Sequence, residues 1–148
     1  MVLTEKETMF IDDLKKQEEL CIKKYNLSAE KACDEQLRQL FKKLETEEQR
    51  HLEVLDEILH GNVPSVPQSK KAASETFEKS RCSKSAQDSD KFLCEDALST
   101  EKYAASSYNT GIFEFKNENV RMMLNHIETE EQNHGKEIYD YMAANGMY

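Results

Sequence analysis

Two copies of one acidic heptapeptide each end in a histidine. The copies are ETEEQRH at 45–51 and ETEEQNH at 128–134, and they begin 83 residues apart. Residues three apart share one face of a helix, so each copy places a carboxylate beside an imidazole. Such a pair can bind a divalent metal ion, although a single Glu-x-x-His on an acidic helix is usually a solvated surface. The pairs are Glu48 with His51 and Glu131 with His134.

Two further glutamates lie on apolar helix faces. Glu18 and Glu101 each have an apolar or small residue four positions before and four positions after, and each precedes the repeated glutamate of its half by 30 residues. Four ionised carboxylates in a core would be strongly destabilising without compensation. No lysine or arginine shares these faces. Two divalent cations would supply the missing positive charge.

The predicted ligand set is four carboxylates and two imidazoles. It suits two iron ions, with manganese as an alternative and zinc as a substitute. One glutamate on each of two helices, with Glu-x-x-His on each of the other two, is the ligand pattern of ferritin-like di-metal bundles. The predicted ligands are Glu18, Glu48, His51, Glu101, Glu131 and His134.

A tyrosine lies seven residues after each of the first glutamates of the two halves. These residues, Tyr25 and Tyr108, share a helix face with Glu18 and Glu101, because seven residues make two turns. They are either core aromatics or partners whose hydroxyls reach a ligand carboxylate. We name both as candidate catalytic residues on the second interpretation.

The first half of the chain predicts a helical hairpin over residues 4–60. TEKE near the N-terminus is a capping box, and Gly61 ends the second helix. We place the turn near Cys33, with Asp34 as the N-cap of the second helix. The sequence SAEKACDE around Cys33 is also compatible with one continuous helix. A continuous helix would separate the two glutamates of this half by about 45 Å.

The second half predicts another hairpin, over residues 89–146, beginning after Asp88 or Ser89. Residues 61–88 are polar and rich in Ser and Lys, and they predict a long connection with one short helical turn near 75–81. Phe92 is expected inside the third helix. When the two halves are aligned at the offset of 83, they match at four separated places, which indicates an internal duplication rather than a chance likeness of acidic helices.

Composition narrows the function classes. The 148 residues carry a formal net charge of −9, which disfavours nucleic acid and anionic membranes as partners. No segment approaches the about 18 apolar residues that a membrane span needs, and the mixed, acidic N-terminus is unlike a secretory signal, so we expect a cytoplasmic location. The four cysteines form no C-x-x-C pair. We expect Cys21 and Cys94 to be buried free thiols and none of the four to be catalytic.

The order of the six predicted ligands resembles that of bacterioferritins and rubrerythrins across nearly the whole chain. The resemblance implies that Glu48 and Glu131 bridge two metals, that Glu18 and His51 complete one of them, and that Glu101 and His134 complete the other. A rubredoxin-type cysteine motif is missing, and Ala104 stands where rubrerythrins carry an extra glutamate. An external electron donor would therefore be required.

Several segments are more similar still to coat F-type spore coat proteins. The segments are LTEKETMFIDDLKKQEELCIKKYN, QLRQLFKKLETEEQRH, EKYAASSYNTGIFEF and the terminal YMAANGMY. This resemblance implies a ferritin-like bundle associated with the sporulating cell or the spore. We therefore expect a single all-α domain over 1–148, a ferritin-like four-helix bundle of two duplicated hairpins joined by a long crossover.

Two functions follow from these expectations. The first is a di-iron or di-manganese oxidoreductase that acts on peroxide or O2, as a peroxide reductase, oxidase or ferroxidase. The second is a structural coat component whose metals only hold the bundle together. Small residues near the ligands would leave room for an oxidant, unless Tyr103 or a methionine fills it. We also expect a homo-oligomer, such as a dimer.

Overall fold

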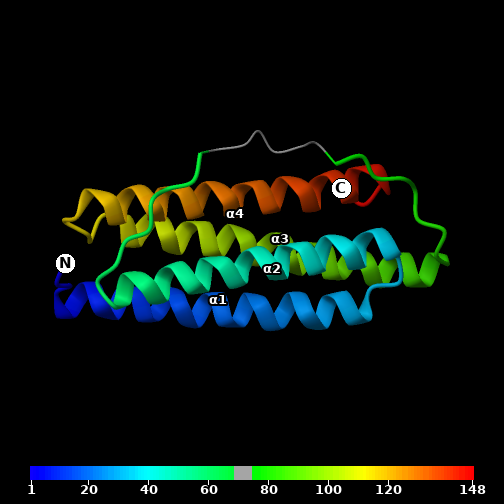
Figure 1. The fold of residues 1–148 in the computed structure, drawn as a ribbon. Helices are drawn as coiled ribbons and strands as arrows, with labels where there is room; N and C mark the ends of the chain where they lie inside the picture. The colour runs from blue at the N-terminus through cyan, green and yellow to red at the C-terminus, as the bar shows by residue number, and fades with distance from the viewer. Residues whose placement is uncertain (69–74) are drawn as a thin grey trace.

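The computed structural model describes residues 1–68 and 75–148. These residues form four long helices and no strand (Figure 1), so the all-α fold in two hairpins is confirmed. The middle of the predicted connection, 69–74, lies outside the described residues. The helices are α1 (Glu5–Lys31), α2 (Glu35–Leu59), α3 (Lys84–Ile112) and α4 (Glu118–Ala144).

The helix ends follow the capping signals of the sequence. The Thr4 hydroxyl accepts from the Glu7 amide, and the Glu7 carboxylate accepts from the Thr4 amide, which completes the capping box of α1. Asp34 caps α2, so the chain turns near Cys33 as predicted. Asn117 caps α4 by accepting two backbone N–H bonds. Gly61, at a φ of 87°, ends α2 in a conformation that a side chain would strain.

Three expectations about the second half were wrong. Helix α3 begins at Lys84 rather than after Asp88 or Ser89, because the Ser83 hydroxyl accepts from the Ala86 amide and caps it there. Residues 75–81 form no helical turn. The Glu78 backbone instead exchanges two hydrogen bonds with the Gln36 side chain, both 2.9 Å long. Phe92 is 69% exposed, because it lies on the face of α3 opposite the buried Asp90 and Cys94.

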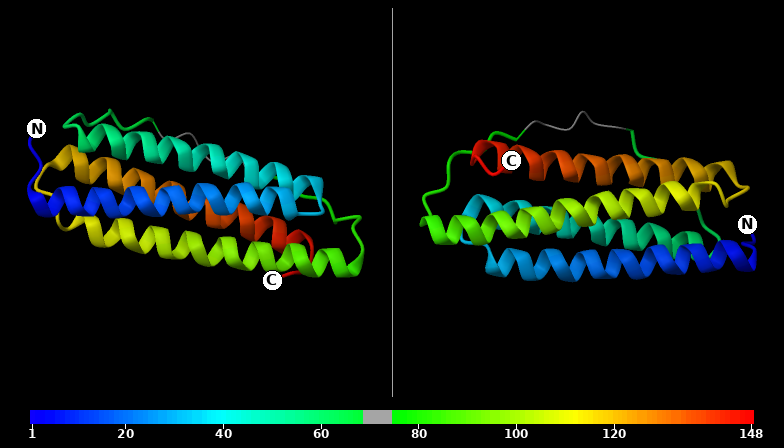
Figure 2. Two further views of the ribbon diagram at one scale, coloured as in Figure 1. Left: turned by 90° about the horizontal axis from the view of Figure 1, so that it is seen from below. Right: turned by 180° about the vertical axis from the view of Figure 1, so that it is seen from behind.

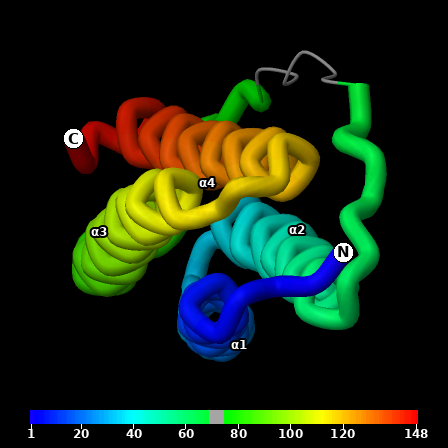
Figure 3. Tube along the Cα trace, turned by 90° about the vertical axis from the view of Figure 1, so that its left-hand side faces the viewer, coloured from blue at the N-terminus to red at the C-terminus, as the bar shows by residue number. Residues whose placement is uncertain are grey.

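The two hairpins pack side by side, with all four helices around one centre (Figure 3). Helices α1 and α2 are antiparallel, as are α3 and α4 (Figure 2). The described parts of the crossover between α2 and α3, residues 60–68 and 75–83, lie on the outside of the bundle towards its opposite ends (Figure 1). None of the helices in 1–68 and 75–148 has the length and apolar character needed to cross a lipid bilayer.

The core consists of two apolar clusters, one toward each end of the bundle. One cluster contains Tyr25, Phe41 and Tyr141, near the α1–α2 turn, and the other contains Ile11, Leu55 and Tyr108, near the α3–α4 turn. Both clusters draw residues from all four helices. The four predicted ligand carboxylates and the two imidazoles lie between them and are almost completely buried. The apolar clusters thus hold the helices rigidly on both sides of a polar centre.

Candidate metal centre

The six predicted ligands converge at the centre of the bundle. Their side-chain donor atoms form two groups of four, and within each group all four atoms lie within 4.8 Å of one another. Two glutamates, one from α2 and one from α4, belong to both groups. The groups are Glu18, Glu48, His51 and Glu131, and Glu48, Glu101, Glu131 and His134.

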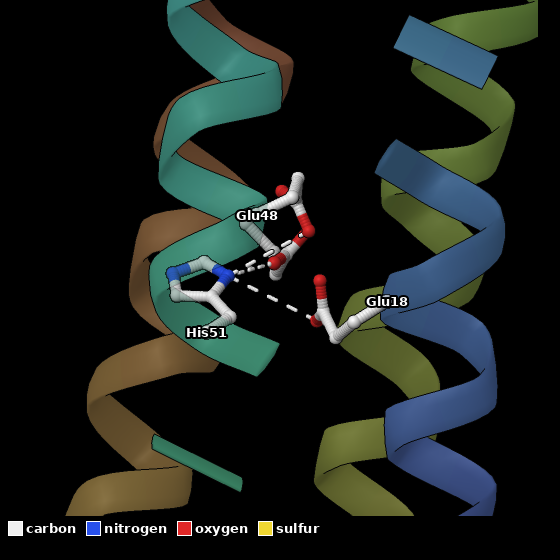
Figure 4. A group of neighbouring side chains, drawn as sticks. Glu18, Glu48 and His51 are labelled. Atoms are coloured by element: carbon white, nitrogen blue, oxygen red, sulfur yellow. Dashed lines mark ion pairs between the residues drawn. The ribbon is translucent and has the colours of Figure 1, made fainter. Parts of the chain in front are cut away.

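Both histidines direct Nδ1 towards the carboxylates. His51 Nδ1 lies 2.8 Å from Glu131 Oε1, 3.6 Å from Glu48 Oε2 and 3.9 Å from Glu18 Oε1. Figure 4 shows Glu18 from α1 meeting Glu48 and His51 from α2 at one point. In the other half, His134 Nδ1 lies 2.8 Å from Glu48 Oε1. The glutamates of each hairpin therefore stand at one level, as their equal spacing predicts.

These close contacts do not satisfy the hydrogen-bonding capacity of the site. In the part of the chain that the structure describes, nine buried side-chain oxygen or nitrogen atoms have no hydrogen-bond partner, and all nine belong to the six residues. Buried polar groups without partners are rare in proteins and each destabilises the fold. Eight of these atoms, all except the outward-facing His51 Nε2, converge on the centre. This convergence fits a pair of bound cations, since cations use the lone pairs that no donor reaches.

Burial and mutual repulsion perturb the acids. Burial, followed by the neighbouring Glu48, raises the pKa of Glu18 well above its usual value. Burial, followed by Glu101, does the same to the pKa of Glu131. Burial opposes charge on His51, but contacts with Glu130 and Glu48 outweigh it and raise its pKa to about 9. Without cations the centre therefore retains protons, which metal ions would displace.

The two tyrosines reach across the bundle to the carboxylate of the opposite half. The Tyr108 hydroxyl donates to Glu18 Oε1 at 2.5 Å, and the Tyr25 hydroxyl donates to Glu101. Burial, followed by the contacted carboxylate, raises the pKa of both phenols, so both remain protonated donors. Both interpretations from sequence are observed, because each ring packs in an apolar cluster and each hydroxyl bonds to a carboxylate of the predicted ligand set. These hydrogen bonds orient Glu18 and Glu101, each of which belongs to only one of the two groups of donor atoms.

Two glutamates outside the predicted ligand set also contact the site. Glu47 and Glu130 each precede a repeated glutamate, and each reaches the outer face of the histidine from the opposite hairpin. His134 Nε2 donates to Glu47 Oε2 at 2.5 Å. His51 Nε2 lies 3.4 Å from Glu130 Oε1. A carboxylate on Nε2 leaves Nδ1 free to bind a metal. Their place in the heptapeptide was the available signal.

The structure also shows how far other reactive side chains of the bundle are buried. Cys21 and Cys94 are buried free thiols, as expected. Tyr103 is 69% exposed, so it does not fill the space near the ligands. The side chain of His126 is only 19% exposed, and its Nε2 lies 2.8 Å from Glu130 Oε1.

The comparisons with known proteins concern the second half of the chain. The Coat F domain model matches residues 89–148. This match covers most of α3 and all of α4, and so includes Glu101, Tyr108, Glu131 and His134. The contributions of α1 and α2 to the centre lie outside it. No curated protein and no solved structure matched the chain in the two other comparisons.

Proposed function

We propose that this chain is a ferritin-like, di-metal component associated with the spore coat, in which two iron or manganese ions hold the four helices together. The observation that carries the metal proposal is the convergence of eight buried, unpartnered atoms from six residues. The Coat F domain match supports the association with the spore coat. The donor set fits two divalent cations, with Glu48 and Glu131 reaching both.

A disulfide bond also supports an association with the spore coat. Cys33 and Cys82 form a disulfide between the α1–α2 turn and the residue before the cap of α3. Such bonds persist outside the reducing cytoplasm. A protein on the surface of a spore would keep this bond, whereas one kept in the cytoplasm would lose it. This favours the spore over the cytoplasmic location expected from composition.

Thermal unfolding with and without metal tests the structural proposal. The protein loaded with Fe²⁺ or Mn²⁺ should melt well above the protein treated with a chelator, because cations bind the folded centre and relieve the repulsion among its carboxylates. At a metal concentration about 1,000 times the dissociation constant, the expected gain is about 4 kcal/mol. Equal melting temperatures would contradict a stabilising role for metal.

Redox activity towards peroxide or O2 is the second candidate. The observation that favours it is the pair of tyrosine hydroxyls bonded to Glu18 and Glu101, since these hydroxyls place hydrogen-bond donors beside the predicted ligands. Two bound ferrous ions would supply electrons to the oxidant. The chain's own residues would hold the ions, orient Glu18 and Glu101 through the tyrosine hydroxyls and exclude bulk water through the two apolar clusters.

The redox candidate has a direct test. The protein is loaded anaerobically with two equivalents of Fe²⁺ and mixed with peroxide or O2, and oxidation is followed optically. Oxidation faster than that of free Fe²⁺ in the same buffer, and faster with peroxide than with O2, supports the candidate. Rates equal to those of free Fe²⁺ leave only the structural function.

A further inference from the structure

The outer faces of the two half-sites differ at one pair of equivalent positions. Lys43 and His126 are related by the offset of 83. Lys43 Nζ pairs with Glu75 at 2.6 Å and with Glu137 at 2.7 Å. His126 Nε2 instead lies 2.8 Å from Glu130 Oε1, four residues later on the same face of α4. At this pair of equivalent positions, one hairpin thus has a lysine held by two carboxylates, and the other has a histidine, a residue type that commonly binds metals.

The two histidines of the predicted ligand set also differ, in the hydrogen bonding of their Nε2 atoms. His134 Nε2 is fully satisfied by its bond to Glu47. His51 Nε2 lies 3.4 Å from Glu130 Oε1 and has no hydrogen-bond partner, although the side chain is 4% exposed. Glu130 is drawn instead towards His126, which is closer. An unpartnered, buried nitrogen therefore points at an accessible Glu–His pair beside the candidate centre.

We propose that Glu130 and His126 bind a divalent metal ion on the outside of the bundle and pass it to the half-site of His51, Glu18 and the two shared glutamates. This proposal rests on the metal pair of the proposed function. A carboxylate and an imidazole one helical turn apart can bind one ion between them. Glu130 is 26% exposed and His126 is 19% exposed, so water can complete the coordination.

The chemistry of this exposed site suits transfer rather than storage. Two protein ligands give weaker binding than four, so the ion remains exchangeable. When Glu130 turns from His126 towards His51, the carboxylate carries the ion inward and gains the unpartnered Nε2 as a hydrogen-bond donor. The ion keeps its charge and oxidation state throughout. On the equivalent face of the other hairpin, Lys43 stands in place of His126 and pairs with Glu75 and Glu137, so that face offers no acid–histidine pair from which an ion could be loaded.

Cobalt binding to the full chain tests this proposal without any turnover assay. Equilibrium dialysis should find two tightly bound Co²⁺ ions and a weaker third, and stopped-flow absorbance should follow the loading of the inner pair. His126→Asn should lose only the third ion and slow inner loading about tenfold, the low end of the rate gain from focused charge. Glu130→Gln should also lose the third ion and slow loading, and it should weaken the inner pair slightly through its contact with His51. His60→Asn is the matched control, because His60 and Asp56 form an exposed acid–histidine pair at the same spacing.

The outcomes separate this site from the metal pair. If the wild-type protein binds no third ion, or if His126→Asn and Glu130→Gln load at the wild-type rate, the transfer site is overturned. If a single Co²⁺ binds and His126→Asn removes it, the exposed site is upheld and the metal pair of the proposed function fails. If His60→Asn loses the third ion, that ion binds near His60 and not at Glu130 and His126, and the proposal is again overturned.

Discussion

The two hairpins carry matching side chains at the centre of the bundle and differ at its ends. At the centre, the contacts among the six predicted ligands have counterparts at the offset of 83, and so does the tyrosine that crosses to the other half. A glutamate also faces each outer histidine nitrogen, although only the contact of Glu47 with His134 is a hydrogen bond. The turns also correspond. Asp90 accepts from the Cys33 amide, and Glu7, its equivalent, accepts from the amide of Lys116.

The differences gather where the crossover meets the bundle. Cys33 forms the disulfide with Cys82, whereas its equivalent is Lys116. Tyr141 donates to Asp34 and packs edge-on against Phe77 of the crossover, whereas its equivalent, Ile58, lies in an apolar cluster. The comparison teaches that duplication supplied a symmetric centre, and that the single crossover made one end of the bundle specialise as its anchor.

The largest expected effect comes from removing a residue that both halves share. Glu131→Gln should weaken both metals by more than about 100-fold each, beyond the usual effect of an outer partner. The two losses sum to about 5 kcal/mol or more of binding free energy, because each tenfold loss of affinity is worth about 1.4 kcal/mol. Isothermal titration with Mn²⁺ measures this loss. Glu128→Gln, in the same heptapeptide, is the control and should bind normally. Retention of one metal at full affinity would show that Glu131 serves only one half.

Next in size is the disulfide, which one end alone possesses. The Cys33→Ser, Cys82→Ser double variant should lose about 4 kcal/mol of stability, because the bond closes a loop of about 50 residues in the unfolded chain. Melting should fall by about 10 °C, measured by circular dichroism. Reductant should lower the melting temperature of the wild type equally and leave the variant unchanged. If metal stoichiometry also fell, the ends and the centre would not be independent.

A smaller effect should distinguish the two outer glutamates. Glu47→Gln should weaken metal binding about 10- to 100-fold, because it replaces the partner of His134 Nε2. Glu130→Gln should weaken equilibrium binding less, since its contact with His51 is longer. Competition with a chelator of known affinity measures both. Equal losses in the two variants would mean that the difference between these contacts has no energetic consequence.

The smallest effect is expected from the tyrosines. Tyr25→Phe and Tyr108→Phe should each lower stability by about 1 kcal/mol, the net value of one hydrogen bond. Because the two bonds are equivalent, the variants should behave alike in urea unfolding and should retain two metals. A large difference between them would show that the symmetry of the centre is only geometric.

Much of the centre could be predicted because helix geometry is periodic. The three-residue spacing put Glu48 beside His51, and the duplication placed the same pair in the other hairpin. The outer role of Glu47 and Glu130 was missed because their positions face outward on their own helices, and only the packing of the opposite helix covers them. The partner of Cys33 could not be deduced either, since cysteine spacing does not fix pairing.

The most direct test of the metal pair is anomalous diffraction from crystals of the iron-loaded protein, with data collected on both sides of the iron edge. We predict two peaks about 3.5–4 Å apart at the centre of the bundle, the separation usual for paired metals. One peak should contact Glu18 and His51, the other should contact Glu101 and His134, and both should contact Glu48 and Glu131. A single central peak, or iron bound only on the surface, would contradict the account.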